Sequence, residues 1–175
     1  MSYPISAPQV PAPGRWPVAS DTEDRATRPD AVAAVLMILG GAAGIAQLWV
    51  PWLSDSGVGA TGWDVFQSIK SGLSVQGGVA PTFGAYAVLA VVVLGVALVL
   101  LGVLMLVRLD HRPPGIVAML AGLLGVLCAV WWVFWHGGAG DLGAMFSTGG
   151  VGWYLFLVSG LVGLIGAIKA LVSAT

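Results

Sequence analysis

The chain has 175 residues, of which 58% are apolar and only 9% charged, and its formal net charge is −1. A soluble domain carries roughly 25% charged residues, so this composition excludes an ordinary globular protein and indicates a membrane protein. The charge balance and the lack of a basic stripe also exclude nucleic acid as a partner.

The amino-terminal segment 1–30 is polar and rich in proline, which predicts an extended cytoplasmic tail. It lacks the short apolar core of a cleavable signal, so we expect the first apolar segment to be retained as an anchor. Tyr3 and Trp16 are unusual residues for a solvated leader. Two alternatives therefore remain for the tail: a disordered leader, or an arm that binds a partner through these two aromatic side chains.

Four segments are apolar and long enough to cross a bilayer as helices, which takes about 20 residues. They are 31–53, 83–107, 115–135 and 151–172. Asp30 precedes the first segment and can cap its free amides. Pro113 and Pro114 can end one helix and begin the next. The prediction is an all-α integral membrane protein, with four transmembrane helices in two hairpins forming one domain, 31–175.

The distribution of positive charge predicts the orientation, because lysine and arginine resist translocation. Only Lys70 falls on one side of the four-span arrangement. On the other side are Arg15, Arg25, Arg28, Arg108, Arg112 and Lys169. Both termini should therefore be cytoplasmic in the plasma (inner) membrane. His111 lies in the charged turn at 108–114, and we expect it to be solvated.

The outer segment between the first two spans contains a helical pattern. Trp63, Phe66 and Ile69 follow one another at helical spacing, and Thr61 and Asp64 have the spacing of a capping box. These features predict a short amphipathic helix at about 62–72, which lies on the outer membrane surface or on a partner.

Tryptophans gather where the spans meet the outer interface. Trp49-Val50-Pro51-Trp52 ends the first span and Trp132-Val133-Phe134-Trp135 ends the third, so each pair would share a helical face. The second and fourth spans open with Gly84-Ala85-Tyr86 and Gly152-Trp153-Tyr154. This doubling indicates either a site between two repeated halves, as in some transporters, or simply the same belt residues at the same interface. We favour the second, because neither half shows a broken helix or a buried charge. Residues expected at this interface are Trp49, Trp52, Trp63, Phe66, Trp132, Trp135 and His136, with Trp131 and Trp153 in the same belt.

Chemistry-bearing residues are scarce. No ionisable residue falls near the middle of a span, Gln47 lies near the outer end of the first, and Lys169 can extend to the headgroups from the last. We expect Cys128 to be a small, buried side chain. His136 and Asp141 are the remaining candidates, but two ligands do not make a zinc site. The sequence therefore predicts no catalytic, cofactor or metal site.

Glycines in the spans are spaced for close helix packing. Gly40 and Gly44 form a small-xxx-small pair, and Gly160, Gly163 and Gly166 line up in the last span. These faces could close the protein's own bundle or meet another subunit, and the sequence leaves both open. Together with Tyr3 and Trp16 they are the candidate partner-binding residues.

A four-span chain biased to Ala, Val, Leu and Gly, with Trp49-Val50-Pro51-Trp52 ending its first span and Gly152-Trp153-Tyr154 opening its last, resembles the tetraspan membrane proteins of actinobacteria. Members of that group occur as accessory subunits of large envelope complexes. Examples are the association factor of the cytochrome bcc–aa3 respiratory supercomplex and the accessory membrane subunit of the Mce lipid importer. The resemblance implies a non-enzymatic accessory or stabilising subunit of a larger membrane complex, the respiratory supercomplex being favoured over the importer.

Two other functions stay open. One is a small transporter or lipid-handling protein that uses the cleft between its two hairpins. The other is an enzyme that acts on lipids at the outer interface through His136 and Asp141.

Overall fold

The computed structural model describes residues 29–52, 60–76, 79–107 and 110–174. In these ranges all regular structure is helical apart from one isolated bridge between Pro51 and Thr61. The helices are α2 (Ala31–Ala46), α3 (Gly62–Gln76), α4 (Val79–Leu104), α5 (Arg112–Thr148) and α6 (Val151–Ser173). Three of them (α4, α5 and α6) are long and apolar enough to cross a membrane, and α2 is a shorter apolar helix. This confirms the prediction of an all-α membrane fold, while the tail bearing Tyr3 and Trp16 lies outside the described residues.

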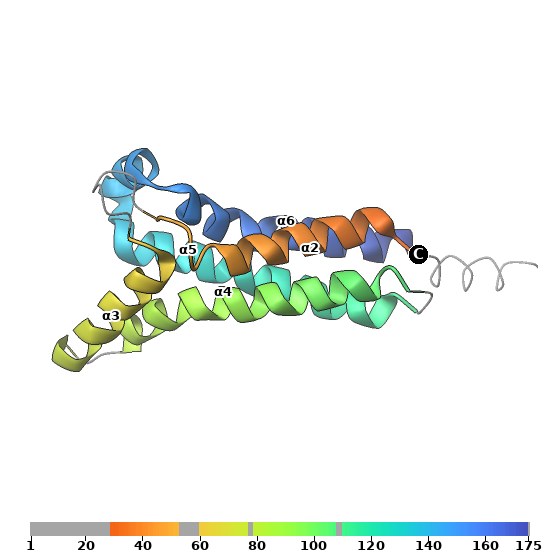
Figure 1. Cartoon of the computed structure of the whole chain (residues 1–175), viewed down its shortest axis with the longest axis horizontal. Coiled ribbons are helices and arrows are strands. Elements are labelled where there is room, and N and C mark those ends of the chain that lie inside the picture. The colour runs from red at the N-terminus through yellow and green to blue at the C-terminus, as the bar shows by residue number, and fades with distance from the viewer. Residues whose placement is uncertain (1–28, 53–59, 77–78, 108–109, 175) are drawn as a thin grey trace, which may run out of the picture.

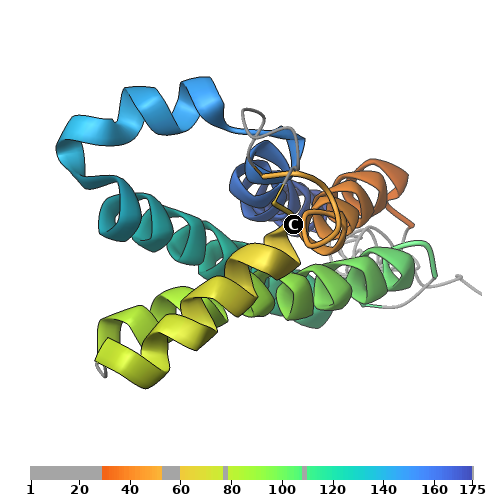
Figure 2. The same cartoon turned by 60° about the vertical axis from the view of Figure 1, so that its left-hand side comes forward.

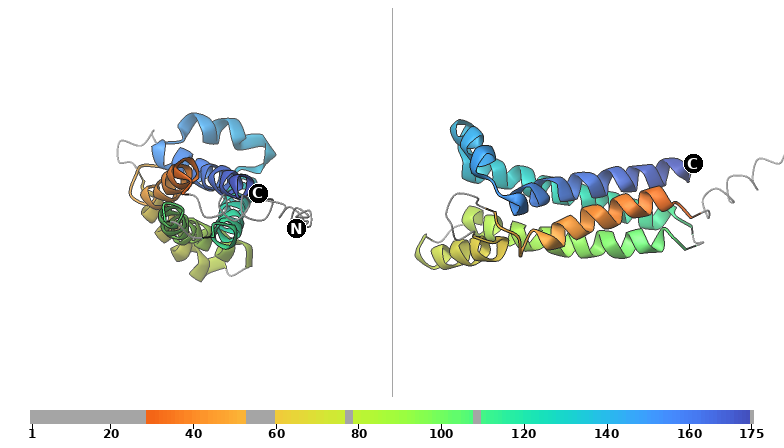
Figure 3. Two further views of the ribbon diagram at one scale, coloured as in Figure 1. Left: turned by 90° about the vertical axis from the view of Figure 1, so that its right-hand side faces the viewer. Right: turned by 45° about the horizontal axis from the view of Figure 1, so that its top comes forward.

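The bundle helices α2, α4, α5 and α6 run side by side along the long axis of the molecule (Figure 1). Helix α2 packs on α4 and α6, and α5 packs on the same two helices. Because the chain reverses direction at each connection, each of these packed pairs is antiparallel. The predicted hairpins are thus present as α2–α4 and α5–α6, closed into a ring that is visible end-on in Figure 3.

Several helix starts follow from local sequence, as predicted. The Asp30 side chain accepts a hydrogen bond from Ala33 N at 3.0 Å and caps α2. In the capping box of α3, the Asp64 carboxylate accepts from Thr61 N at 2.9 Å and the Thr61 hydroxyl accepts from Asp64 N at 3.3 Å. Proline occupies the first positions of α5, where no amide donor is needed.

The first span differs from its prediction, because the helix ends at Ala46 rather than near residue 53. A continued helix would need an amide on residue 51 to donate to Gln47 O, and Pro51 has none. The Trp52 indole nitrogen supplies that donor instead, at 2.8 Å. The chain then leaves the helix, and Trp52 N donates to Ala60 O at 2.8 Å. The first span is therefore a shorter helix than predicted, followed by turns up to Trp52.

The other bounds shift as well. Helix α4 begins at Val79, before the predicted 83, and ends at Leu104. Helix α5 does not stop near 135 but continues through the predicted outer loop to Thr148. Figure 2 shows that α5 changes direction sharply in its light-blue part, where 137–140 reads Gly-Gly-Ala-Gly. Glycines bend this helix without ending it.

Beyond the bundle, two segments flank the same end on opposite sides. Helix α3 lies beside the start of α4, and the last part of α5 lies on the far side (Figures 1 and 3). The predicted amphipathic helix at 62–72 is therefore present and extends to Gln76. Phe66 is buried at 5% exposure, and Val65 and Ile69 are partly buried against the same core, so this chain itself covers part of the apolar face of α3.

Glycines close the helix interfaces. A Cβ added at Gly40 would lie 2.5 Å from Gly163 N, one at Gly41 would lie 2.4 Å from Gly95 O, and one at Gly160 would lie 2.6 Å from Val126 N. These contacts join α2 to α6, α2 to α4, and α6 to α5. Only the absence of a side chain allows the backbones to approach this closely.

Candidate functional site

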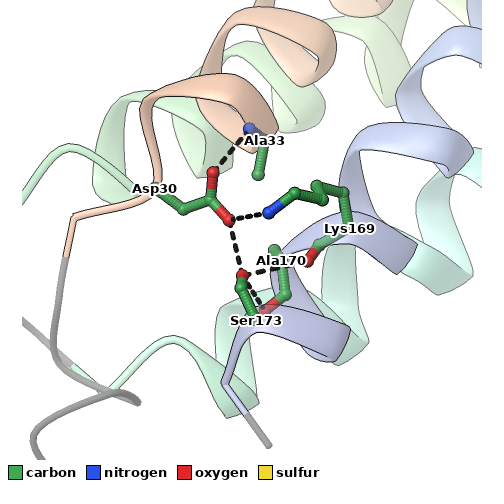
Figure 4. Close-up of polar contacts among 5 residues, drawn as sticks. All are labelled: Asp30, Ala33, Lys169, Ala170 and Ser173. Atoms are coloured by element: carbon green, nitrogen blue, oxygen red, sulfur yellow. Dashed lines mark hydrogen bonds and ion pairs between the residues drawn. The ribbon is translucent and has the colours of Figure 1, made fainter.

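Polar groups of the bundle gather at its two ends, which we call the Asp30 end and the Trp52 end. At the Asp30 end one carboxylate joins the start of α2 to the end of α6 (Figure 4). Asp30 Oδ1 accepts the capping bond from Ala33 N. Asp30 Oδ2 accepts from Lys169 Nζ at 2.9 Å and from the Ser173 hydroxyl. The cap was predictable from the sequence, but the two partners on α6 were not, since their only signal was a shared position at the predicted cytoplasmic end.

Hydrogen bonds to backbone carbonyls join the other helices to this end. Asp30 N donates to Met105 O at 3.1 Å, just beyond α4, and Arg112 Nη2 donates to Ala174 O at 3.2 Å. His111 is 2% exposed, and its Nε2 lies 2.9 Å from Val107 O, to which it donates. The expectation that His111 is solvated is therefore wrong: the ring covers the end of the bundle.

The electrostatics of Asp30 suit a structural role. Partial burial raises the pKa of its carboxyl. Hydrogen bonds from Ala33 N, Ser173 and Lys169, together with the Lys169 charge, lower it and outweigh the effect of burial, so the net pKa lies below its ordinary value. Both carboxylate oxygens are already occupied by donors of this chain. The group is thus ionised and paired, and its geometry is that of a clasp between helices.

Aromatic rings fill the Trp52 end of the interior. Trp52 contacts Trp132 edge-on at 5.7 Å between ring centroids, Trp153 at 5.7 Å and Phe156 at 5.0 Å. All four side chains are at most 4% exposed. Cys128 belongs to the same buried cluster at 3% exposure, as predicted for a small buried side chain.

This packing corrects the predicted tryptophan belt. Trp52, Phe66, Trp132 and Trp153 are buried in the protein rather than turned to the headgroups, whereas Trp49, Trp63 and Trp131 are exposed. Trp49 and Trp52 do not share a helical face, because the helix has ended before them. The two copies of the proposed repeat also differ in their surroundings, because Trp49 is exposed and its counterpart Trp132 is buried. The side chains of Trp135 and His136 lie outside the described part of the structure.

Two buried polar atoms of this cluster have no hydrogen-bond partner among the described residues: Gln47 Oε1 and Trp153 Nε1. Gln47 is fully buried, and its Nε2 donates to Val88 O at 3.3 Å. Gln47 lies at the end of the first helix, as the sequence predicted, but the sequence gave no sign that it would be enclosed by α3, α4 and Trp52.

A small cavity lies deeper in the ring, with a volume of about 10 Å³. That is about the room one water molecule needs. Ser159 is the one polar side chain among its lining residues, and its hydroxyl donates to Phe156 O within the same helix at 3.0 Å. The remaining lining residues are Gly40, Val91, Leu94, Gly95, Leu98, Ala121, Gly125 and Gly160.

The candidate partner-binding glycines all face inward. Gly40, Gly44, Gly160, Gly163 and Gly166 are buried against residues of this chain, so of the two alternatives left open by the sequence, their faces close the protein's own bundle. The side chains of the candidates His136 and Asp141 are outside the described residues. Among the residues that are described, no group of three or more His, Cys, Asp or Glu side chains could hold a metal ion.

No protein-family model, curated protein or solved structure matches the chain.

Proposed function

We propose that this chain is a multi-pass protein of the plasma (inner) membrane, with both termini cytoplasmic, that serves as a non-catalytic accessory or stabilising subunit of a larger membrane complex. The packing of the described part of the bundle interior carries this proposal. The cavity beside Ser159 between the helices has a volume of about 10 Å³ and is lined almost entirely by glycine and aliphatic residues. The carboxylate at the Asp30 end is occupied by its own helices.

The exterior is what remains for interaction. Bulky aliphatic side chains cover the outward faces of the bundle helices, such as Val35 and Leu39 on α2 and Leu120 and Leu127 on α5. Membrane lipids suit such faces, and so does a neighbouring subunit that packs by close van der Waals contact. Because the glycines are used inside, a partner helix would meet large side chains rather than a glycine groove.

The resemblance to actinobacterial tetraspan proteins supplies the class of partner. A respiratory supercomplex is the first choice and a lipid importer the second. The proline-rich tail, with Tyr3 and Trp16, would lie along the cytoplasmic side of that complex.

The cavity seen among the described residues gives a transporter function no support. Substrate passage between the hairpins requires a path lined by polar groups or water, and the described cavity is the size of one water molecule with a single polar side chain.

The test is affinity purification of the tagged chain from its native membrane in mild detergent, followed by mass spectrometry. We expect stoichiometric recovery of cytochrome or importer subunits. A matched pair of variants locates the contact: Tyr3→Ala with Trp16→Ala should reduce recovery if the tail binds the partner, and Trp63→Ala, an exposed tryptophan at the opposite end, should not. Recovery of the chain alone, or only as copies of itself, would contradict the proposal.

A further inference from the structure

Each bundle helix has an exposed aromatic side chain near the Trp52 end. Those whose rings carry a polar atom are Trp49, Tyr86, Trp131 and Tyr154, with exposures between 42% and 66%, while Phe134 and Phe146 on α5 are exposed but wholly apolar. Trp49 closely follows α2, and the other three lie on α4, α5 and α6. They form an outward row that is distinct from the buried tryptophans of the same end, whose positions are set by packing. Amphipathic rings of this kind prefer the boundary between hydrocarbon and headgroups.

A second row at the Asp30 end is fixed by hydrogen bonds. Asp30 N donates to Met105 O, and the Ser173 hydroxyl donates to the Asp30 carboxylate. Arg112 on α5 reaches Ala174, which directly follows α6. These bonds place Asp30, Met105 and Ser173 at one level, and the Arg112 side chain reaches the same end of the bundle. The charged members of this row and the nearby Lys169 belong in the headgroup layer rather than in hydrocarbon.

The two rows are separated by the same interval of sequence along α4, α5 and α6, and by the same interval from Asp30 to Trp49, which lies beyond the end of α2. The interval from Asp30 to Trp49 equals that from Arg112 to Trp131. On the helices that run the other way, the intervals from Tyr86 to Met105 and from Tyr154 to Ser173 are again the same. At a rise of about 1.5 Å per residue, this shared interval corresponds to about 28 Å along the axes of α4, α5 and α6, and to slightly less thickness where a helix tilts.

Side chains between the rows are suited to acyl chains. The outward positions of this band carry Val32, Val35 and Leu39 on α2, Val93, Val96 and Leu100 on α4, Leu120, Leu124 and Leu127 on α5, and Leu161, Ile165 and Ile168 on α6. Beyond the aromatic row, α3 exposes Asp64, Gln67 and Lys70, which belong in water or among headgroups.

We infer that the bundle is matched to a hydrocarbon layer about 28 Å thick, slightly thinner than the common value of about 30 Å, with α3 and the end of α5 outside that layer. Between the two rows, the outward surface of the bundle thus contacts the acyl chains of a bilayer of defined thickness. This inference depends on the membrane-spanning helices and not on the identity of any partner complex.

The experiment reconstitutes the full chain in monounsaturated phosphatidylcholines whose acyl chains run from about 14 to about 22 carbons, which brackets the inferred thickness on both sides. The midpoint temperature of unfolding, followed by tryptophan fluorescence, should be highest in the bilayer whose hydrocarbon thickness is nearest to the separation of the two rows. It should fall in thinner and in thicker bilayers. A midpoint that rises steadily with thickness, or that peaks in the thickest lipid, would overturn the inference.

A variant pair tests the role of the aromatic row. Replacing Trp49, Tyr86, Trp131 and Tyr154 with leucine extends the apolar band upward, so the optimum should move to thicker bilayers. The control replaces Leu39, Leu100, Leu124 and Leu161, which lie outward within the band, with alanine, and it should keep the optimum of the wild-type chain. An unchanged optimum in the aromatic variant would also contradict the inference, whereas loss of the partner complex in the purification above would leave it unaffected.

Discussion

The indole nitrogen of Trp52 donates to the backbone carbonyl of Gln47 at 2.8 Å, in the place of an amide that Pro51 lacks. This one bond satisfies a carbonyl that the end of α2 would otherwise leave buried without a donor. It also pulls the Trp52 ring inward, against Trp132, Trp153 and Phe156. The same hydrogen bond therefore accompanies both the early end of the first span and the packing of the aromatic cluster.

Trp52→Phe should destabilise the bundle more than Trp153→Phe. Both substitutions shrink a buried ring, but the first also removes a hydrogen bond to a buried carbonyl, worth about 1–2 kcal/mol. The Trp153 indole nitrogen has no partner among the described residues, so its removal leaves no group unsatisfied there. Chemical or thermal unfolding of the two variants in the same detergent measures the difference. Equal losses of stability would show that the Trp52 bond contributes little.

Gly40→Ala should lower stability by about 1–3 kcal/mol, because its new Cβ would meet the backbone of α6, which cannot move aside without opening the ring. Gly143→Ala is the matched control. It replaces a helical glycine that has nothing within 4 Å of the new atom, and the better helix propensity of alanine should make it neutral or up to about 1 kcal/mol stabilising. If both variants unfold at the wild-type midpoint, the close approach of α2 to α6 is not as described.

Substitutions of the Asp30 clasp should fall in a definite order. Asp30→Ala loses the cap of α2 and both contacts with α6, and the cap alone is worth about 0.5–2 kcal/mol. Asp30→Asn keeps a good cap and loses the ion pair. Lys169→Met removes only an ion pair in which the lysine is 45% exposed, so it should cost less than about 1 kcal/mol. The midpoint of thermal unfolding should therefore be lowest for Asp30→Ala. A larger loss of stability for Lys169→Met would show that the ion pair contributes more than the cap.

The clasp should also make stability depend on acid. The pKa of Asp30 is lower in the folded chain than its ordinary value, so the folded state favours the ionised carboxylate. Its contribution is complete above the unfolded pKa of about 4 and is lost as pH falls through the folded value. Stability measured between about pH 6 and pH 3 should therefore fall more steeply for the wild-type chain than for Asp30→Asn. Asp64, whose pKa is also lowered by its bonds with Thr61, is present in both and cancels in the comparison.

The features that could be predicted from the sequence were those that depend on neighbouring residues in the chain. Helix α6 begins where expected and ends one residue beyond, and the caps at Asp30 and Thr61 form as their spacing indicates. Sequence patterns gave wrong predictions where a tertiary contact determines the local structure. An apolar run continues through Gln47 to Leu53, and although Pro51 argues against a helix through it, the bond from Trp52 to Gln47 O is visible only in the fold.

The candidate sites show the same division. Tryptophan near a span end is typical of an interface, yet Trp132 is buried, because exposure depends on which face of α5 meets its neighbours. The pairing of Asp30 with Lys169, 139 residues apart, requires knowing that α2 lies beside α6. The glycine faces were visible in the sequence, but whether they meet this chain or another could be decided only from the closed ring.

The proposed function depends on which end of the bundle faces the cytoplasm, and single-cysteine labelling measures that directly. Cys128 is the only cysteine and is buried, so Cys128→Ala gives a clean background. Into it are placed Ser71→Cys on α3, Gly143→Cys on the outer part of α5, and Asp110→Cys between α4 and α5. In intact cells a membrane-impermeant maleimide should label the first two, and it should label Asp110→Cys only after the membrane is permeabilised. Labelling of Asp110→Cys in intact cells, with Ser71→Cys and Gly143→Cys protected, would contradict the cytoplasmic placement of the Asp30 end and the proposals built on it.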